Sequence, residues 1–302
     1  MSVHRVLVIG RSGQVASALA GRQGSAAVDY VCVGRPAADL ASRQSLAAAI
    51  ARHRPALVVN AGAWTAVDLA ESQVDSAFDV NAEGPARLAR FCRTVGIPLV
   101  HLSTDYVFDG RSTRPYREAD PVAPLNAYGR TKEAGERAVR SEIGEHIILR
   151  LGWVFDATHG NFVTTILRLA GERTTLDVVH DQTGTPSFAA DIAGAIDLIA
   201  RRILGGTATW GTFHVANGGH TTRYEQAREI VRLAARHGLR EPDIRPILTP
   251  ENEAARRPRY SVLDTTRARD IFGVDLPPWQ DALARCIERR FAPGAPSRAV
   301  SS

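Results

Sequence analysis

The chain has 302 residues, of which 44% are hydrophobic, and a formal net charge of +5. This length and composition suit a domain with a sizeable core and exclude an intrinsically disordered chain. No run of about 18 apolar residues appears, so we expect no transmembrane segment. The N-terminus lacks the layout of a signal peptide. The three cysteines, Cys32, Cys92 and Cys286, are scattered and odd in number, which predicts a reducing, cytoplasmic location without disulfides.

The basic residues are almost entirely arginine. Among the 37 lysines and arginines, only Lys132 is a lysine. The arginines are spread along the chain without a basic stretch interleaved with aromatic residues, so we predict no nucleic-acid partner. Solvated surface accounts for most of them, although a phosphorylated small molecule would suit the charge as well.

Short apolar runs alternate with helix-patterned segments in the first half of the chain. Runs rich in valine, leucine and isoleucine, apolar on both faces, indicate parallel strands covered by helices on both sides. The expected strands are Val6–Gly10, Tyr30–Gly34, Ala56–Asn60, Pro98–Thr104 and His146–Phe155, and the expected helices are Ser12–Arg22, Ser42–His53 and Val80–Val95. This alternation predicts a doubly wound, Rossmann-type α/β domain over residues 1–155.

The pattern changes beyond residue 155, where helices are separated by longer polar loops. The expected helices are Asn161–Ala170, Ala189–Leu204, Tyr224–His237 and Trp279–Phe291. We therefore predict a smaller, more helical substrate-binding region over residues 156–291. Segments such as Thr212–Ala216 are expected to return to the main sheet, and residues 292–302 to form a mobile tail. The proline-rich stretch Phe108–Leu125 predicts a long loop, of the kind that is functional or disordered.

A glycine turn follows the first predicted strand. In the segment Gly10-Arg-Ser-Gly13-Gln-Val-Ala16, Gly10 lets the strand turn sharply and Gly13 lets the backbone approach a pyrophosphate. The Gly-x-x-Gly spacing after a first strand resembles that of the short-chain dehydrogenase/reductase superfamily. We expect Gly10, Ser12, Gly13, Gln14 and Val15 to contact a dinucleotide.

The second predicted strand bears on which dinucleotide binds. NAD sites usually carry an acid at this point, whereas this strand ends Gly34-Arg35. An arginine suits a 2′-phosphate, so NADPH is favoured, with NADH possible. Asp39 and Leu40 follow, where the superfamily commonly contacts adenine. Asp39 could instead cap the helix that begins near Ser42.

A tyrosine and the single lysine stand four residues apart at the start of a predicted helix, in Tyr128-Gly-Arg-Thr-Lys132. Residues at this spacing share a helix face, and Asn126 is a plausible N-cap. A neighbouring ammonium would favour the phenolate and lower the pKa of Tyr128 below its ordinary value near 10. Tyr128 could then exchange a proton with a carbonyl oxygen, and Lys132 could also hold the nicotinamide ribose.

Further segments carry a more specific resemblance. They are Asn60-Ala-Gly-Ala-Trp-Thr-Ala-Val-Asp68-Leu-Ala-Glu71, Leu102-Ser-Thr-Asp-Tyr-Val-Phe-Asp-Gly110, Pro124-Leu-Asn-Ala-Tyr-Gly-Arg-Thr-Lys132, Arg150-Leu-Gly-Trp-Val-Phe155, Asp181-Gln-Thr-Gly-Thr-Pro186 and Ala255-Arg-Arg-Pro258 with Ser261-Val-Leu-Asp264. Together they resemble the dTDP-4-dehydrorhamnose reductase family over nearly the whole chain. The resemblance implies NAD(P)H-dependent reduction of the 4-keto group of dTDP-4-dehydro-β-L-rhamnose, in dTDP-rhamnose and polysaccharide biosynthesis.

The resemblance also implies roles for individual residues. Thr104, Tyr128 and Lys132 would be catalytic, with Thr104 and Tyr128 holding the keto oxygen. Asp105, Trp153 and Arg257 would contact the sugar nucleotide, with Trp153 as a flat apolar wall. Further cofactor contacts would be Ala61, Gly62, Ala63, Thr65 and Leu102. Related 4,6-dehydratases carry Thr-Asp-Glu where this chain has Thr-Asp-Tyr, so the acid pair that eliminates water is missing.

Several alternatives stay open at this stage. Asp105 could be a turn cap, Trp153 an ordinary core residue, Thr65 a helix cap, and Arg257 part of a solvated loop. The substrate could be another dTDP-4-keto-6-deoxyhexose. The chain also resembles the NADP-binding regulatory β-subunit of methionine adenosyltransferase. Some family members bind magnesium through glutamates at a dimer interface, but this chain has Ala18 and Ala190 there, so magnesium and that mode of a possible homodimer are in doubt.

Overall fold

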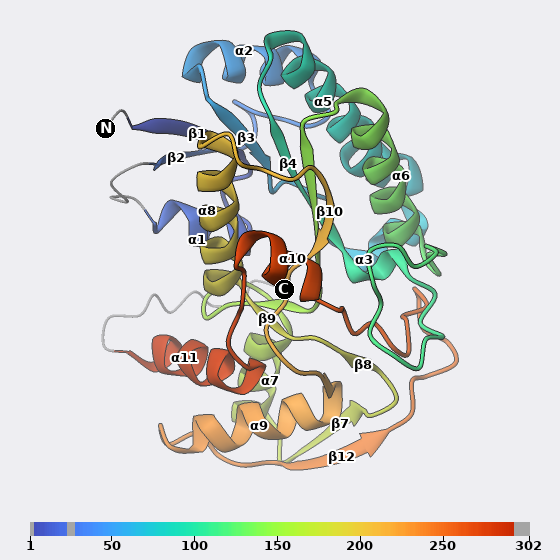
Figure 1. The fold of residues 1–302 in the computed structure, drawn as a ribbon. Coiled ribbons are helices and arrows are strands. Elements are labelled where there is room, and N and C mark those ends of the chain that lie inside the picture. Colours follow the sequence, from blue (N-terminus) through green and yellow to red (C-terminus); the bar gives the residue numbers. More distant parts are fainter. Residues whose placement is uncertain (1–2, 23–27, 293–302) are drawn as a thin grey trace.

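The computed structural model describes residues 3–22 and 28–292. The expected mobile tail therefore lies, except for Ala292, outside the described residues. The molecule has an upper part built on a parallel sheet and a lower part that is mostly helical (Figure 1).

The central sheet has six strands in the order β10-β5-β4-β3-β1-β2, and every neighbouring pair is parallel. Their bounds are β1 (His4–Ile9), β2 (Val28–Val33), β3 (Leu57–Asn60), β4 (Leu99–Thr104), β5 (His146–Leu151) and β10 (Gly211–His214). Strand β10 comes from the second half of the chain and pairs with β5. The order reverses direction between β1 and β3, and ligands of such sheets bind at the carboxyl ends of the strands at that point.

Helices cover both faces of this sheet. On β1, Val6 and Val8 face one apolar core, and Leu7 and Ile9 face the other. The first core contains α1 (Gln14–Ala20), α8 (Ala189–Leu204) and α10 (Thr266–Phe272); the second contains α2 (Arg43–His53), α5 (Gly84–Val95) and α6 (Ala127–Glu142). Figure 1 shows the two groups on opposite sides of the strands. The predicted doubly wound parallel sheet is confirmed.

The helix expected over Val80–Val95 begins earlier and is irregular. Helices α3 (Val67–Ser72) and α4 (Val74–Phe78) precede a π-helical turn over Asp79–Glu83, which leads into α5. Inside this turn the Asn81 amide accepts a hydrogen bond from Trp64 N (2.8 Å) and donates to Thr131 Oγ1 (3.0 Å). The turn therefore connects the loop after β3 to α6. The spacing of apolar residues in the sequence does not predict these long-range contacts.

The lower part has its own core, made by α7 (Phe162–Glu172), α9 (Arg223–Ala235) and α11 (Trp279–Phe291). Short strand pairs flank it: β6 (Val154–Phe155) with β9 (Ser187–Phe188), β7 (Thr175–Val179) with β12 (Asp243–Ile247), and β8 (Thr183–Gly184) with β11 (Thr221–Thr222). Strand β12 is half-exposed and contains Pro246, so it has no apolar run that would predict it.

One expectation needs correction, and one pair of alternatives can be decided. The strand expected over His146–Phe155 is interrupted, because Trp153 adopts a left-handed backbone conformation with φ 41° and separates β5 from β6. The loop Phe108–Leu125 is held by its own aromatic side chains: the rings of Phe108 and Tyr116 stack with centroids 4.1 Å apart, and both are buried. Of the two alternatives, disorder is therefore excluded for this loop.

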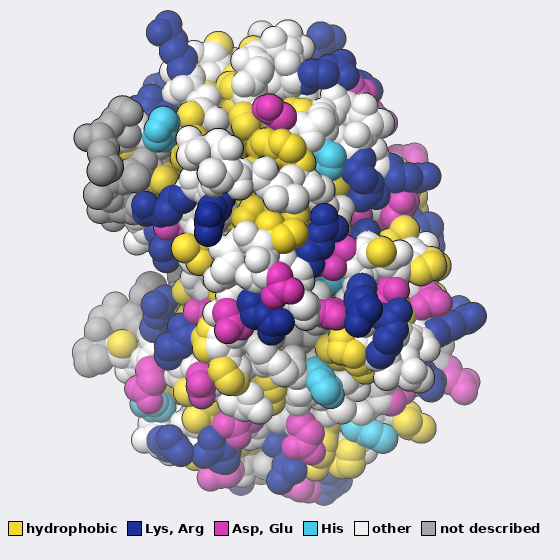
Figure 2. All heavy atoms as spheres, in the orientation of Figure 1, with side chains coloured by type: hydrophobic (Ala, Val, Ile, Leu, Met, Phe, Trp, Pro, Cys, Tyr) yellow, Lys and Arg dark blue, Asp and Glu magenta, His cyan; other side chains and the backbone are white. Residues whose placement is uncertain are grey.

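Basic and acidic side chains alternate over the face shown in Figure 2, without one large basic area. Many arginines pair with carboxylates, as Arg90 and Arg93 do with Glu142. None of the helices in the described ranges has the length and apolar character needed to cross a bilayer.

Candidate active site

A cleft of about 690 Å³ opens at the carboxyl ends of β1, β3, β4 and β5. Its walls come from the turn after β1, the loop after β3, the end of β4, the first turns of α6, and the starts of α7 and α9. Most predicted site residues line it: Ser12, Gly13, Gln14, Val15, Ala61, Ala63, Thr65, Leu102, Thr104, Asp105, Tyr128, Lys132 and Trp153. The fold thus brings together residues that are far apart in the sequence.

The glycine turn has the features that a close backbone approach needs. Gly10 has φ +128°, and a Cβ there would lie 3.2 Å from the carbonyl carbon of Ala61. A Cβ on Gly13, by contrast, would meet nothing within 4 Å, so the backbone at Gly13 faces open space at the edge of the cleft. Gly13 is also the N-cap of α1.

Six predicted cofactor residues do not line this cleft, namely Gly10, Gly34, Arg35, Asp39, Leu40 and Gly62. Arg35 is exposed beyond the end of β2. Leu40 is a core residue, which explains the glycines beside it: Cβ atoms on Gly62 and Gly84 would lie 3.1 and 2.7 Å from its side chain. Asp39 accepts from Ala41 N (3.0 Å), and Ser42, not Asp39, caps α2.

Tyr128 and Lys132 both face the cleft from α6, and the predicted cap is confirmed, because Asn126 accepts from Gly129 N (2.7 Å). Lys132 is 2% exposed and donates from Nζ to Leu102 O (2.7 Å). Burial lowers the pKa of Lys132 to about 8, against the opposing charge of Glu136.

The expected effect of the lysine on Tyr128 is wrong for this structure. The pKa of Tyr128 is raised well above its ordinary value, mainly by burial, and the charges of Asp105 and Tyr106 add to the rise. Only a hydrogen bond with Thr104 opposes it. The Lys132 ammonium donates to the Leu102 carbonyl and is not among the groups that shift the pKa of Tyr128. Tyr128 is therefore a protonated acid in this state.

Thr104 ends β4, and Asp105 begins a short 3₁₀ turn. Thr104 Oγ1 donates to Asp105 Oδ1 (3.1 Å) and accepts from Tyr106 N (3.2 Å). Asp105 is 2% exposed, and its Oδ2 has no hydrogen-bond partner in the described part of the chain. Burial raises the pKa of Asp105 to about 6, although Ser261, Thr104 and Arg223 favour the carboxylate. A buried carboxylate oxygen without a partner is unsuited to a mere turn cap.

The Trp153 ring has two close neighbours, Arg223 and Gly184. The guanidinium of Arg223 lies over one face, 3.5 Å from the ring centroid. Gly184 lies against the ring as well, since a Cβ there would overlap the indole. Arg223 also contacts the ring of Phe162 (4.7 Å). Trp153 lines the cleft, and the Arg223 guanidinium covers part of its ring.

Arg257, predicted to contact the sugar nucleotide, binds acidic side chains of the protein. Its guanidinium binds both carboxylate oxygens of Asp68 (3.0 and 2.9 Å) and lies 3.6 Å from Glu253. It does not line the cleft, although it lies close enough to Arg223 for the two charges to repel.

Sequence reasoning assigned no role to several residues that line the cleft: Val67, Leu151, Val154, His159, Gly160, Phe162 and Arg223. One signal was available for Arg223. It follows the cap Thr222 as the first residue of α9, where a cation is electrostatically unfavourable. His159 is held by Asp156 and by Ser17 Oγ (3.3 Å), contacts that no local pattern predicts.

A fully paired ionic cluster lies beneath the cleft. Glu136 of α6 is buried and accepts from Ser103 Oγ (2.6 Å), from Arg150 Nε and Nη2 (2.9 and 2.8 Å) and from Arg140 Nη1 (3.1 Å). These bonds hold its pKa below the usual range despite burial. They lock α6 onto β4 and β5, and so fix the helix that carries Tyr128 and Lys132.

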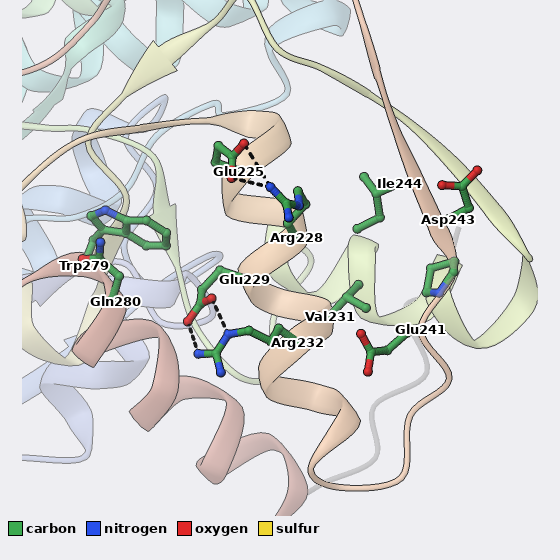
Figure 3. A pocket seen from close by; sticks show the side chains of 11 residues that line it. Glu225, Arg228, Glu229, Val231, Arg232, Glu241, Asp243, Ile244, Trp279 and Gln280 are labelled. Atoms are coloured by element: carbon green, nitrogen blue, oxygen red, sulfur yellow. Dashed lines mark hydrogen bonds and ion pairs between the residues drawn. The ribbon is translucent and has the colours of Figure 1, made fainter.

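A second hollow, of about 560 Å³, lies between α9, β12 and the start of α11 (Figure 3). Its charged side chains mostly bind one another: Arg228 pairs with Glu225, and Arg232 with Glu229. It contains none of the predicted site residues, so the chemistry belongs to the cleft at the sheet edge.

The described ranges contain no group of three His, Cys, Asp or Glu side chains that could hold a metal ion. Ala18 and Ala190 pack against apolar clusters.

A parallel doubly wound sheet, a glycine turn after its first strand and a Tyr–Lys pair on α6 define a dinucleotide-binding fold of the short-chain dehydrogenase/reductase type. Residues 4–291 match the family described as RmlD substrate binding domain, and the chain belongs to this family.

Named relatives agree with this assignment. A dTDP-4-dehydrorhamnose reductase of Streptomyces griseus is 42% identical, covering 92% of this chain and 91% of that protein. A dTDP-4-keto-6-deoxy-D-glucose reductase of Streptomyces niveus is 38% identical, covering 94% and 96%. The solved dTDP-4-dehydrorhamnose reductase of Bacillus anthracis in complex with NADP has a TM-score of 0.87 at 31% identity, covering 94% and 99%.

Proposed function

We propose that the protein is an NADPH-dependent reductase that converts dTDP-4-dehydro-β-L-rhamnose to dTDP-L-rhamnose, with NADH as a possible second reductant. The observation that carries the proposal is the convergence of Thr104 from β4 with Tyr128 and Lys132 from α6 on one cleft. Family membership and the reductase names of the relatives support the substrate class. The division at residue 155 into a cofactor-binding and a substrate-binding part belongs to the same proposal.

The cleft suits a dinucleotide. Open space at Gly13 leaves room for a pyrophosphate against the backbone, and Ala61, Ala63 and Thr65 line the same side. Lys132 offers an ammonium that could turn from Leu102 O towards a ribose hydroxyl. When bound, the reduced dinucleotide supplies the hydride that adds to carbon-4 of the sugar.

The side chains supply the proton and the geometry. Because its pKa is raised, Tyr128 carries its proton at neutral pH and gives it to the oxygen at carbon-4 as the carbonyl is reduced. Thr104, within hydrogen-bonding reach of Tyr128, holds the same oxygen. Lys132 stabilises the phenolate that remains. Tyr106 lies where dehydratases have an acid, so reduction proceeds without elimination of water.

Arg35 is proposed to select NADPH over NADH. Its exposed guanidinium at the end of β2 is free of carboxylate partners among the described residues and could bind a 2′-phosphate. Arg35→Ala should raise KM for NADPH much more than KM for NADH. Arg43→Ala, which removes another exposed arginine nearby on α2, is the matched control. Equal changes with both cofactors would remove the argument for NADPH.

A second candidate substrate is another dTDP-4-keto-6-deoxyhexose, favoured by the Streptomyces niveus relative. A panel of dTDP-4-keto sugars, followed by NADPH oxidation and by NMR of the product at carbon-4, separates the two. We expect the highest kcat/KM for dTDP-4-dehydro-β-L-rhamnose. Binding of NADP without reduction of any sugar in the panel would favour the regulatory-subunit alternative.

Location and assembly belong to the proposal too. The cysteines Cys32, Cys92 and Cys286 are all free thiols, which supports a reducing compartment, and we place the protein in the cytoplasm. A homodimer would have to form without a glutamate-bound metal at Ala18 and Ala190.

A further inference from the structure

Arg223 occupies a position that costs stability in three ways. It is drawn from solvent into the cleft, and burial lowers its pKa to about 10. It is the first residue of α9, whose N-terminal end carries positive partial charge. Within the described part of the chain it forms no ion pair; its side chain donates to Gln226 Oε1 (3.3 Å), and the nearby Tyr106 hydroxyl favours its charged form.

Aromatic contacts hold the guanidinium in this place. It lies flat on Trp153 and contacts Phe162, which partly offsets its loss of hydration. Gly184 also lies against Trp153, and any larger residue at this position would overlap the indole. The guanidinium is therefore held in one orientation in the cleft.

The surrounding charges favour an anionic ligand. Arg257 lies near enough to repel Arg223, but its own charge is matched by Asp68 and Glu253. Asp105 faces Arg223 without forming an ion pair, and burial disfavours its charged form. A pKa of about 6 leaves Asp105 mostly charged at neutral pH, but the Arg223 guanidinium forms no ion pair with it or with any other described side chain, so donors of the guanidinium stay available to an anionic ligand.

We propose that Arg223 binds the diphosphate of the sugar nucleotide, with Trp153 serving as the support of its guanidinium and not as the wall that contacts the sugar ring. The proposal rests on the proposed function for the identity of the ligand. A planar guanidinium with several donors suits two phosphoryl oxygens. The glycine turn around Gly13 is a separate part of the cleft, so the two nucleotides would have separate diphosphate contacts.

The test measures binding of dTDP by calorimetry, which requires no turnover. Arg223→Gln should weaken dTDP binding about 10- to 100-fold, and KM for the sugar nucleotide should rise by a similar factor. Binding of thymidine, which lacks the diphosphate, and KM for NADPH should be unchanged. Arg223→Lys keeps the charge without the planar fork and should show a smaller loss.

Arg228→Gln is the matched control, because Arg228 lies on the same helix, is exposed and pairs with Glu225 outside the cleft. It should leave dTDP binding unchanged. Unchanged dTDP binding in a folded Arg223→Gln protein overturns the proposal, whether or not the KM for the sugar rises. A variant that binds NADPH more weakly but binds dTDP as the wild type does would also overturn the proposal. Absence of sugar reduction by the wild type, with dTDP binding that depends on Arg223, would instead refute the proposed function alone.

Discussion

Two clusters of buried charge meet β4 near its carboxyl end, and they differ in how their charges are matched. Glu136, which binds Ser103 of β4, has arginine partners on both carboxylate oxygens. Asp105, two residues further along, has an oxygen without a partner, and Arg223 opposite it forms no ion pair with any described residue. The first cluster stabilises the helix that carries the site, whereas the second is left incomplete where a ligand can complete it.

The difference follows from the cost of burying charge. A buried ion needs partners, and breaking a buried pair is strongly destabilising. Incomplete pairing persists in native proteins mainly where binding or catalysis uses it. The two clusters therefore predict opposite responses to substitution: loss of stability from the first, and loss of function from the second.

The largest effect is expected from Tyr128→Phe, which removes the proton donor and little else. Turnover should fall about 10²- to 10⁴-fold, while NADPH binding and the unfolding midpoint stay near the wild-type values. Steady-state assays and cofactor titration measure this. Tyr224→Phe, on α9 beside Arg228, should be nearly neutral. Near-normal turnover of Tyr128→Phe would rule out its assignment as the acid.

Glu136→Gln breaks the paired cluster and leaves Arg150, which is only 3% exposed, without its counter-charge. The free energy of unfolding should fall by about 3–5 kcal/mol, as measured by urea denaturation. Glu142→Gln, on the same helix α6, is the control. The Glu142 carboxylate pairs with the exposed Arg90 and Arg93 of α5, so this substitution should lower the free energy of unfolding far less. Equal losses in the two variants would contradict the distinction between the clusters.

Asp105→Asn should raise the free energy of unfolding at neutral and alkaline pH, whereas Glu136→Gln lowers it. The folded-state pKa of about 6 lies above the unfolded value near 3.8, so the wild type loses stability as pH rises through this window. At pH 8 the variant should be more stable by roughly 1–3 kcal/mol, and less active. The gain should vanish near pH 4. Denaturant titrations at both pH values measure it, and a variant less stable than the wild type at pH 8 would refute the incomplete-pairing account of Asp105.

The smallest effect is a pH dependence set by Lys132. Because its folded-state pKa is about 8, the ammonium is present below that pH and is lost above it. The kcat/KM for sugar reduction should fall about tenfold per pH unit beyond the pKa. Lys132→Arg, which keeps its charge, should be slower but lack this alkaline fall. A wild-type profile that is flat to pH 10 would exclude the ammonium from the reaction.

Local patterns in the sequence predict the sheet, the glycine turn and the Tyr128–Lys132 pair, whereas the roles of Thr104 and most other cleft residues come from the family resemblance. Valine- and leucine-rich runs define the strands, and the Gly10 turn, Thr104 and the Tyr128–Lys132 spacing each lie directly after or beside one of them. The carboxyl ends of parallel strands meet at one edge, so such residues converge without further information.

What the sequence does not predict arises from contacts between distant segments. Trp153 has a left-handed backbone conformation, and its indole lies against Gly184, which is 31 positions away in the sequence. Apart from its position at the start of α9, nothing in the local sequence distinguishes Arg223 from the other arginines, and only the fold places its guanidinium against the Trp153 ring. The raised pKa of Tyr128 also depends on burial, which a spacing of four residues cannot reveal.

The central claim is that the cleft delivers hydride to carbon-4 of a dTDP-linked keto sugar, and isotope transfer tests it most directly. The wild-type protein would be incubated with dTDP-4-dehydro-β-L-rhamnose and NADPH deuterated at the transferring carbon of the nicotinamide, with each face labelled in turn. We predict one deuterium at carbon-4 of dTDP-L-rhamnose from one of the two labelled cofactors, read by NMR. A sugar that carries no deuterium with either cofactor would contradict the account.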